Sequence, residues 1–199
     1  SPSSFAFNPW FLDEYDLFRD GFLGHSQEII FSNKHDFNNR VDFQLADLKV
    51  KSLNSSLVYF WERQNKTIKK EFEIWCKKQF WLENHSIFME LRNQNNNLPW
   101  WEWPEKFAIC DKRELANWKN NNQKELLGHN LIQWHLDRQW KSVRKLAKKL
   151  GIFLFGDVPF YVSKDSADVW SNRSLFSILT NSDTYLQSGV PPDYFSETG

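Results

Sequence analysis

Apolar residues recur at helical spacing along the chain, and the clearest case is the stretch from Leu131 to Leu150. There an apolar residue returns every three or four positions, which is the repeat of one face of an α-helix. Basic side chains lie largely off this face, and Gly151 follows in the position of a C-terminal cap. The pattern predicts a helix whose apolar face packs against the core. The face consists of Ile132, Leu136, Trp140, Val143, Ala147 and Leu150.

Two weaker helical patterns lie near the start of the chain. A short helix is expected after Asp13, with Gly21 at its end, because a left-handed glycine often follows the last helical turn. A second helix is expected from about residue 46 to residue 63, although serine and asparagine residues interrupt its pattern.

The middle of the chain carries a stronger helical pattern from Lys66 to about Arg92. Its apolar residues cover two faces, and the segment is long enough to be two helices broken near Asn84. A loop rich in asparagine and proline follows. Asp111 then predicts a helix N-terminus, with Glu114 at the position that closes a capping box.

A run of four apolar residues, 152–155, follows the clearest helix without any alternation. Such a run predicts a strand buried on both faces of a parallel sheet, and hence an α/β fold. Asp157 comes directly after it, where α/β barrels place their chemistry, and Gly156 allows the backbone to turn there. The pattern alone leaves two roles open for Asp157, an acid that caps a turn or a residue of a functional site.

Other residues with chemical potential have structural interpretations. Asp165 is expected to cap a short helix that contains Asp168, so both aspartates are assigned structural roles. His85, His129 and His135 do not show the spacing of a metal site, which needs several convergent ligands. We therefore expect these histidines to serve packing or surface roles, and we expect no bound metal.

The stretch 189–199, with the sequence GVPPDYFSETG, has the character of a stiff loop. Two consecutive prolines remove backbone donors and fix φ, which excludes a helix or an inner strand. The loop carries Asp193, Tyr194 and Phe195, and stiff loops that present rings and a carboxylate often bind a ligand.

Charge and composition exclude several classes of protein. The 199 residues, a length suited to one domain, contain 25 basic and 25 acidic side chains, so nothing indicates a nucleic-acid or membrane-surface partner. No apolar run approaches the roughly 20 residues of a membrane helix, and early acidic residues lead us to expect no signal peptide. Cys76 and Cys110 are expected to be reduced thiols. The composition is that of a cytoplasmic protein.

Aromatic residues are unusually abundant, with 11 tryptophans and 18 phenylalanines. Most are expected in the core, because large rings bury much apolar area. Proteins that bind sugars also expose rings, and composition does not choose between these interpretations.

Three linked motifs resemble those of the 4-alpha-glucanotransferases, glycoside hydrolase family seventy-seven. They are GIFLFGDVPFYV at 151–162, DSADVW at 165–170 and GVPPDYFSETG at 189–199. Weaker similarity lies upstream in SFAFNP, in VDF, in FWLENHSIFMEL and in PWWEWP, so the resemblance covers essentially the whole chain. In the first of these, Phe7 stands where the family pattern has glycine.

The resemblance implies an α-amylase-like (β/α)8 TIM barrel with a large helical insertion, of which this chain would be an incomplete fragment. Residues 1–199 would form part of the catalytic barrel domain. The insertion would span about 40–130, and a helix, a barrel strand and an active-site lid loop would span about 131–199. The implied reaction is a retaining transfer of α-1,4-glucan segments between maltodextrins, without a cofactor.

The resemblance also assigns roles to individual residues. Asp157 would line the donor subsite, while Tyr194 and Phe195 would form a lid that grips the glucan and excludes water. Asp193 and Ser196 would position that lid or contact sugar hydroxyls. The predicted substrate-binding residues are Asp157, Tyr161, Asp193, Tyr194, Phe195 and Ser196.

The catalytic carboxylates of the family have no counterpart in this sequence. The motifs that carry the nucleophile and the acid/base are expected beyond Gly199, so the chain resembles an internal piece that is inactive alone. Two alternatives stay open, an amylase-type hydrolase and a truncated, non-catalytic glucan-binding fragment.

Overall fold

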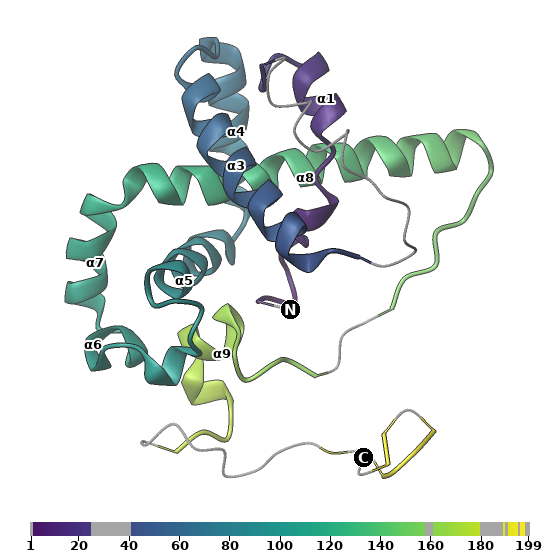
Figure 1. Ribbon diagram of the computed structural model, residues 1–199. Coiled ribbons are helices and arrows are strands. Elements are labelled where there is room, and N and C mark those ends of the chain that lie inside the picture. The colour runs from purple at the N-terminus through teal and green to yellow at the C-terminus, as the bar shows by residue number, and fades with distance from the viewer. Residues whose placement is uncertain are drawn as a thin grey trace.

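A computed structural model of the chain describes residues 2–24, 41–157, 161–179, 189, 191–194, 196 and 197. Over these residues the protein is helical, and no β-strand element occurs among them (Figure 1). None of the described helices combines the length and apolar character of a membrane span. The α-helices are α1 (Glu14–Arg19), α3 (Phe43–Trp61), α4 (Lys66–Lys78), α5 (Leu82–Gln94), α6 (Glu105–Ala108), α7 (Lys112–Asn121), α8 (Gln123–Lys149) and α9 (Ala167–Ser171); the 3-10 turns are η1 (Pro9–Phe11), η2 (Trp100–Glu102) and η3 (Arg173–Leu175).

Side-chain caps explain where several helices begin. Asp13 accepts a hydrogen bond from the backbone N–H of Tyr15 at 2.8 Å, which starts α1 as predicted. Asp42 caps α3 in the same way, so that helix begins slightly before the predicted position. The predicted helices at both places are confirmed.

The predicted capping box of α7 forms only in part. Asp111 accepts from the backbone N–H groups of Arg113 and Glu114, both at 2.9 Å. The Glu114 carboxylate does not close the box, because it pairs with Lys106 at 2.9 Å.

The break between α4 and α5 lies earlier than predicted. Gln79 has an extended backbone, with φ −99° and ψ 93°, and ends α4 there. Asn84, where the break was expected, lies inside α5. The apolar pattern continues through the break, which is why its position could not be found from spacing alone.

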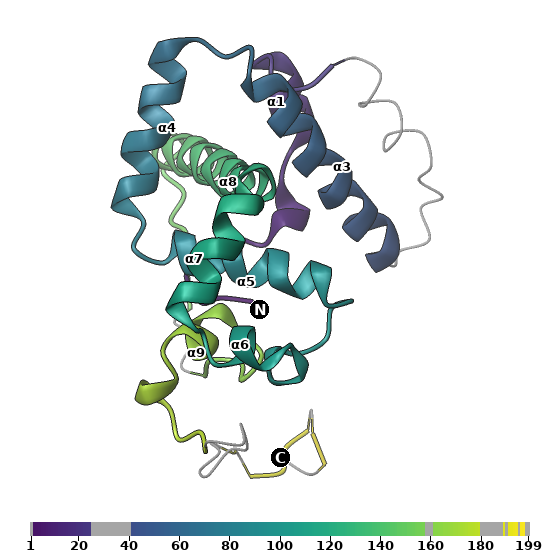
Figure 2. The same ribbon diagram turned by 90° about the vertical axis from the view of Figure 1, so that its left-hand side faces the viewer.

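The long helix α8 is the central element of the fold. It crosses the molecule between α3 and α5, and Figure 2 views it almost along its axis. The expected division of the chain near residue 130 falls inside α8 and stays a prediction. Gly151 ends the helix in the predicted left-handed conformation, with φ 70°.

Two apolar cores flank α8. The first joins the N-terminal segment, α3, α4 and α8. Its fully buried members include Leu12, Leu17, Phe22, Leu57 and Leu131. The second joins α5, the tryptophan-rich turn η2 and α9. Its fully buried members include Phe88, Leu91, Trp100 and Trp170.

The predicted apolar face of α8 is buried over only part of its length. Ile132, Leu136 and Ala147 are buried, whereas Trp140, Val143 and Leu150 are exposed. The prediction that the whole face packs against the core is therefore wrong for the described chain. The C-terminal half of α8 extends past α3 and α4 (Figure 1).

The predicted buried strand at 152–155 is also not found. The segment is extended but belongs to no strand, and Phe153 and Phe155 are 98% and 103% exposed. A parallel strand needs neighbours that take its hydrogen bonds and cover both faces, and the described residues supply none.

Helix α3 approaches α8 closely at Gly128. A Cβ atom there would lie 2.0 Å from Oδ1 of Asn54 on α3. We expect Gly128→Ala to lower the free energy of unfolding by about 1–3 kcal/mol, although alanine is the better helix former by about 1 kcal/mol. Urea denaturation followed by circular dichroism measures the change.

The control for this substitution is the double variant Asn54→Ala/Gly128→Ala, in which the clashing side chain is absent. It should regain most of the stability that Gly128→Ala loses. A Gly128→Ala protein as stable as the parent would contradict the close approach.

Candidate functional site

The DSADVW motif forms α9 and docks on the tryptophan-rich turn. Trp170 is 1% exposed, and its indole N–H donates to the backbone carbonyl of Phe107 at 2.8 Å. In the other direction, the indole N–H of Trp100 donates to the carbonyl of Lys164 at 2.7 Å. The motif is thus held in place by hydrogen bonds on both sides, and the last segment of the chain follows it.

The helix cap in this motif differs from the prediction. Ser166 caps α9, because its hydroxyl accepts from the backbone N–H of Val169 at 3.2 Å. Asp165, which was predicted to do so, instead pairs with Arg92 of α5 at 3.0 Å. Ser166 is the last extended residue before the helix, with φ −145°, so its side chain is the one that reaches the helix end.

Asp168 joins α9 to the beginning of the chain. Its carboxylate accepts from the Ser3 hydroxyl at 2.9 Å and from the Ser4 N–H at 2.7 Å. The Ala167 N–H also donates to the Pro2 carbonyl at 2.7 Å. Sequence reasoning missed this junction, because no local pattern signals a contact between residues 165 positions apart.

The same N-terminal segment is fastened to α8. The backbone N–H and C=O of Phe7 bond to the side-chain amide of Gln133, both at 2.9 Å. Gln133 is buried and satisfied by these two bonds. The segment that contains SFAFNP is therefore held between α8 and α9.

Asp157 and Tyr161 lie on the segment that connects α8 to α9. Both side chains are exposed, Asp157 at the end of the extended run and Tyr161 after residues 158–160, which lie outside the described residues. The structure thus places these two predicted site residues on one connecting segment at the surface.

Asp193 and Ser196 form a small closed turn. The Asp193 N–H donates to the Ser196 carbonyl at 2.9 Å, and the Ser196 N–H donates to the Asp193 carboxylate at 2.9 Å. Between them Tyr194 is 96% exposed. Phe195, the second predicted lid ring, lies outside the described residues. The turn therefore presents the Tyr194 ring outward on a hydrogen-bonded loop.

The described cysteines and histidines carry no reactive site. Burial raises the pKa of Cys76 to about 11 and that of Cys110 to about 12, so neither thiol is a nucleophile at neutral pH. Burial lowers the pKa of His85 and of His135 to about 3. Within the described ranges, no three His, Cys, Asp or Glu side chains are grouped to hold a metal ion.

Comparison with known proteins identifies the family. The model of the glycoside hydrolase 77 family, described as 4-alpha-glucanotransferase, matches residues 1–199. The chain is 34% identical to a 4-alpha-glucanotransferase of Synechocystis and 32% identical to one of Thermus thermophilus, in each case over 99% of this chain and 39% of the relative.

A solved structure shows the same fold. The amylomaltase from Streptococcus agalactiae in complex with acarbose superimposes with a TM-score of 0.89 at 24% identity, over 99% of this chain and 40% of that one. The chain thus spans about two fifths of the length of these three relatives. With a family match along its whole length, the chain belongs to glycoside hydrolase family 77, the 4-alpha-glucanotransferases.

Proposed function

We propose that the full-length protein is a 4-alpha-glucanotransferase that moves α-1,4-glucan segments between maltodextrins through a glucosyl-enzyme intermediate. The observation that carries this proposal is the family match over residues 1–199, together with relatives of that name at 30–34% identity along 99% of the chain. The amylomaltase neighbour, solved with acarbose, further supports α-glucans as ligands.

The proposal divides the chemistry between two parts of the protein. The nucleophile and the acid/base would lie in the part of the relatives that this chain does not match. Asp157 would line the donor subsite at the end of its segment, with Tyr161 beside the bound glucan. Transfer then follows the two-carboxylate logic of retaining glycosidases, with a sugar hydroxyl in place of water as acceptor.

The exposed apolar residues after α8 support the incomplete-barrel interpretation. Phe153 and Phe155 are almost fully exposed, and a folded protein rarely leaves such a run uncovered. Neighbouring strands of a (β/α)8 barrel would cover both faces of 152–155 and place Asp157 at the C-terminal rim.

The assay that tests the function uses the full-length protein and maltotriose. Transfer produces glucose together with a ladder of longer maltodextrins. Glucose and maltose without a ladder would replace the proposal with the hydrolase alternative. The 199-residue chain assayed alone is expected to produce neither, and a ladder from it would contradict the division of the chemistry.

Substitution of Tyr194 tests whether this loop acts as a lid over the bound glucan. In the full-length protein, we expect Tyr194→Ala to lower the ratio of transfer to hydrolysis about three- to tenfold, because the ring stacks on the glucan and excludes water. The ratio is measured from the products of maltotriose. Tyr59→Ala removes an exposed ring on α3 and should leave the ratio unchanged. If Tyr194→Ala also left it unchanged, the ring would not act as a lid.

A further inference from the structure

The stretch 162–165 fastens the preceding surface segment to the second core. Val162 packs against that core. The carbonyl of Lys164 accepts from the indole N–H of Trp100 at 2.7 Å, and the Trp100 ring is fully buried. These contacts begin directly after Tyr161, so they fix one end of the segment that presents this residue at the surface.

An ion pair with α5 completes this attachment just before α9. Nη1 of Arg92 lies 3.0 Å from Oδ2 of Asp165, and the two side chains are 28% and 21% exposed. The other carboxylate oxygen, Oδ1, is buried, and no residue within the described ranges donates a hydrogen bond to it. The charge of Arg92 therefore offsets part of the cost of holding this carboxylate partly out of water.

The ion pair is not needed to begin α9, because the Ser166 hydroxyl caps that helix. A partly buried ion pair also contributes little net stability, since desolvation cancels much of the attraction between the charges. Its value then lies in fixing one arrangement of the two elements that it joins. Here it joins α5, which belongs to the second core, to the stretch that leads back to Tyr161 and Asp157.

We propose that Arg92 is a positioning residue, which acts through Asp165 to hold the surface segment before α9 in place at the glucan site. That segment carries Asp157 and Tyr161, so the inference rests on the proposed function. Without the guanidinium, the Asp165 carboxylate turns toward water, and the stretch that contains it moves with it. A displacement of about 1 Å at groups that orient a substrate is enough to lower the rate about a hundredfold.

The test is the maltotriose assay of the full-length protein with Arg92→Met, which removes the charge and keeps a long apolar side chain. We expect kcat for transfer to fall about tenfold to a hundredfold, while KM changes less than about threefold, because placement matters most in the transition state. Arg92→Lys keeps the positive charge and should recover most of the lost rate.

A double variant separates positioning from stability. Arg92→Met/Asp165→Asn removes both charges, so no unpaired carboxylate remains, and the urea midpoint should lie within about 0.5 M of the parent value. The link between α5 and the stretch 162–165 is still absent, so kcat should stay at least about tenfold low. If the pair only stabilised the fold, the double variant would regain the kcat of the parent, and the inference would be overturned.

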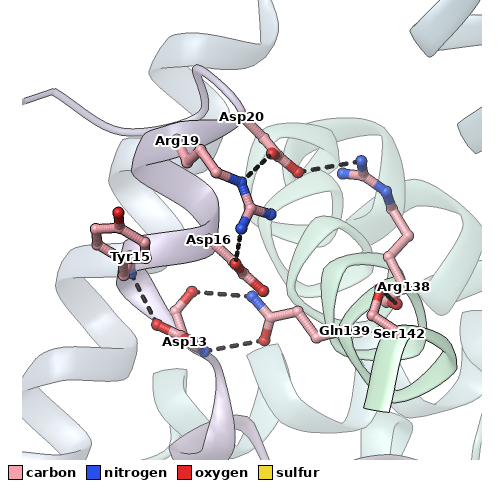
Figure 3. A network of polar contacts seen from close by, with 8 residues as sticks. All are labelled: Asp13, Tyr15, Asp16, Arg19, Asp20, Arg138, Gln139 and Ser142. Carbon is pink, nitrogen blue, oxygen red and sulfur yellow. Dashed lines mark hydrogen bonds and ion pairs between the residues drawn. The ribbon is translucent and has the colours of Figure 1, made fainter. Parts of the chain in front are cut away.

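The matched control is Asp20→Asn in the full-length protein. Asp20 and Arg138 form another ion pair between two elements, at 3.3 Å, and it joins α1 to α8 (Figure 3). Helices α1 and α9 lie on opposite sides of α8 in both ribbon views (Figures 1 and 2). Asp20→Asn should therefore leave kcat and KM unchanged.

A second readout tests the placement without any activity. The ¹⁹F NMR signal of a fluorotyrosine incorporated at position 161 should shift in the double variant and stay in place in Asp20→Asn. An unchanged signal in the double variant would overturn the inference, as would a parental kcat in Arg92→Met. A parent that makes no ladder of maltodextrins would refute the proposed function instead, and the ¹⁹F signal would still show whether Arg92 places the segment.

Discussion

Replacement of Trp170 by alanine is expected to lower the free energy of unfolding by about 3–5 kcal/mol. The indole is 1% exposed and packs against Phe88 and Trp103, with ring centroids 5.9 Å away in both cases. Its loss opens a cavity in the second core and leaves the Phe107 carbonyl without its donor. Urea denaturation followed by circular dichroism measures the effect.

Trp140→Ala is the matched control, since this ring lies on α8 and is 43% exposed. Trp140→Ala should lower the free energy of unfolding by less than about 1 kcal/mol. Equal costs for the two substitutions would contradict the assignment of Trp170 to a packed core.

Acid is expected to destabilise the protein because two neutral histidines are buried. Burial holds the pKa of His85 and of His135 at about 3 in the folded state, against about 6.5 in the unfolded chain. The unfolded state therefore binds more protons below about pH 6.5, so stability falls as the pH decreases. At pH 5 the loss is about 2 kcal/mol for each histidine.

Glu90 also makes the folded protein less stable as the pH falls. Burial alone would raise its pKa, but hydrogen bonds and the charge of the facing His129 outweigh this and lower it. A carboxylate with a lowered pKa contributes stability that is lost as the pH falls through the folded value. The stability that Glu90 contributes is therefore lost at a lower pH than the pH at which the two histidines begin to destabilise the protein.

The measurement is urea denaturation at several pH values between 7 and 5. His85→Phe removes one titrating group from a buried site, and its stability should decline about half as steeply with acid. Stability that does not change over this interval would show that the two imidazoles are not buried in neutral form.

Local chemistry was predictable from the sequence in part, since the Asp111 cap formed whereas Ser166 took the place of the predicted Asp165 cap. Long-range packing was not predictable. The caps at Asp13 and Asp111 and the left-handed Gly151 depend only on neighbouring residues, and the structure confirms them. The burial predicted for the whole apolar face of α8 and for the run at 152–155 was wrong for the described chain. Their burial depends on partners, which spacing along the chain does not reveal.

The candidate site shows the same limit. The stiff loop at 189–199 was predicted from its prolines, and in the described part of it the structure adds the reciprocal bonds between Asp193 and Ser196. The polar network of α1 with α8 and the bonds of Asp168 to the N-terminal segment had no sequence signal. In each case the partners are far apart in the chain, and only the fold brings them together.

The hydrogen bonds of Ser3 and Ser4 to Asp168 can form only after residue 168 has been synthesised on the ribosome. Ser3 and Ser4 are synthesised before Asp168 and cannot complete these contacts until residue 168 has been added, which takes about ten to thirty seconds at typical elongation rates. During that interval the N-terminal segment is attached through other contacts, such as the bonds of Phe7 to Gln133 once α8 has emerged. Translation speed therefore determines how long Ser3 and Ser4 remain without their hydrogen bonds to Asp168.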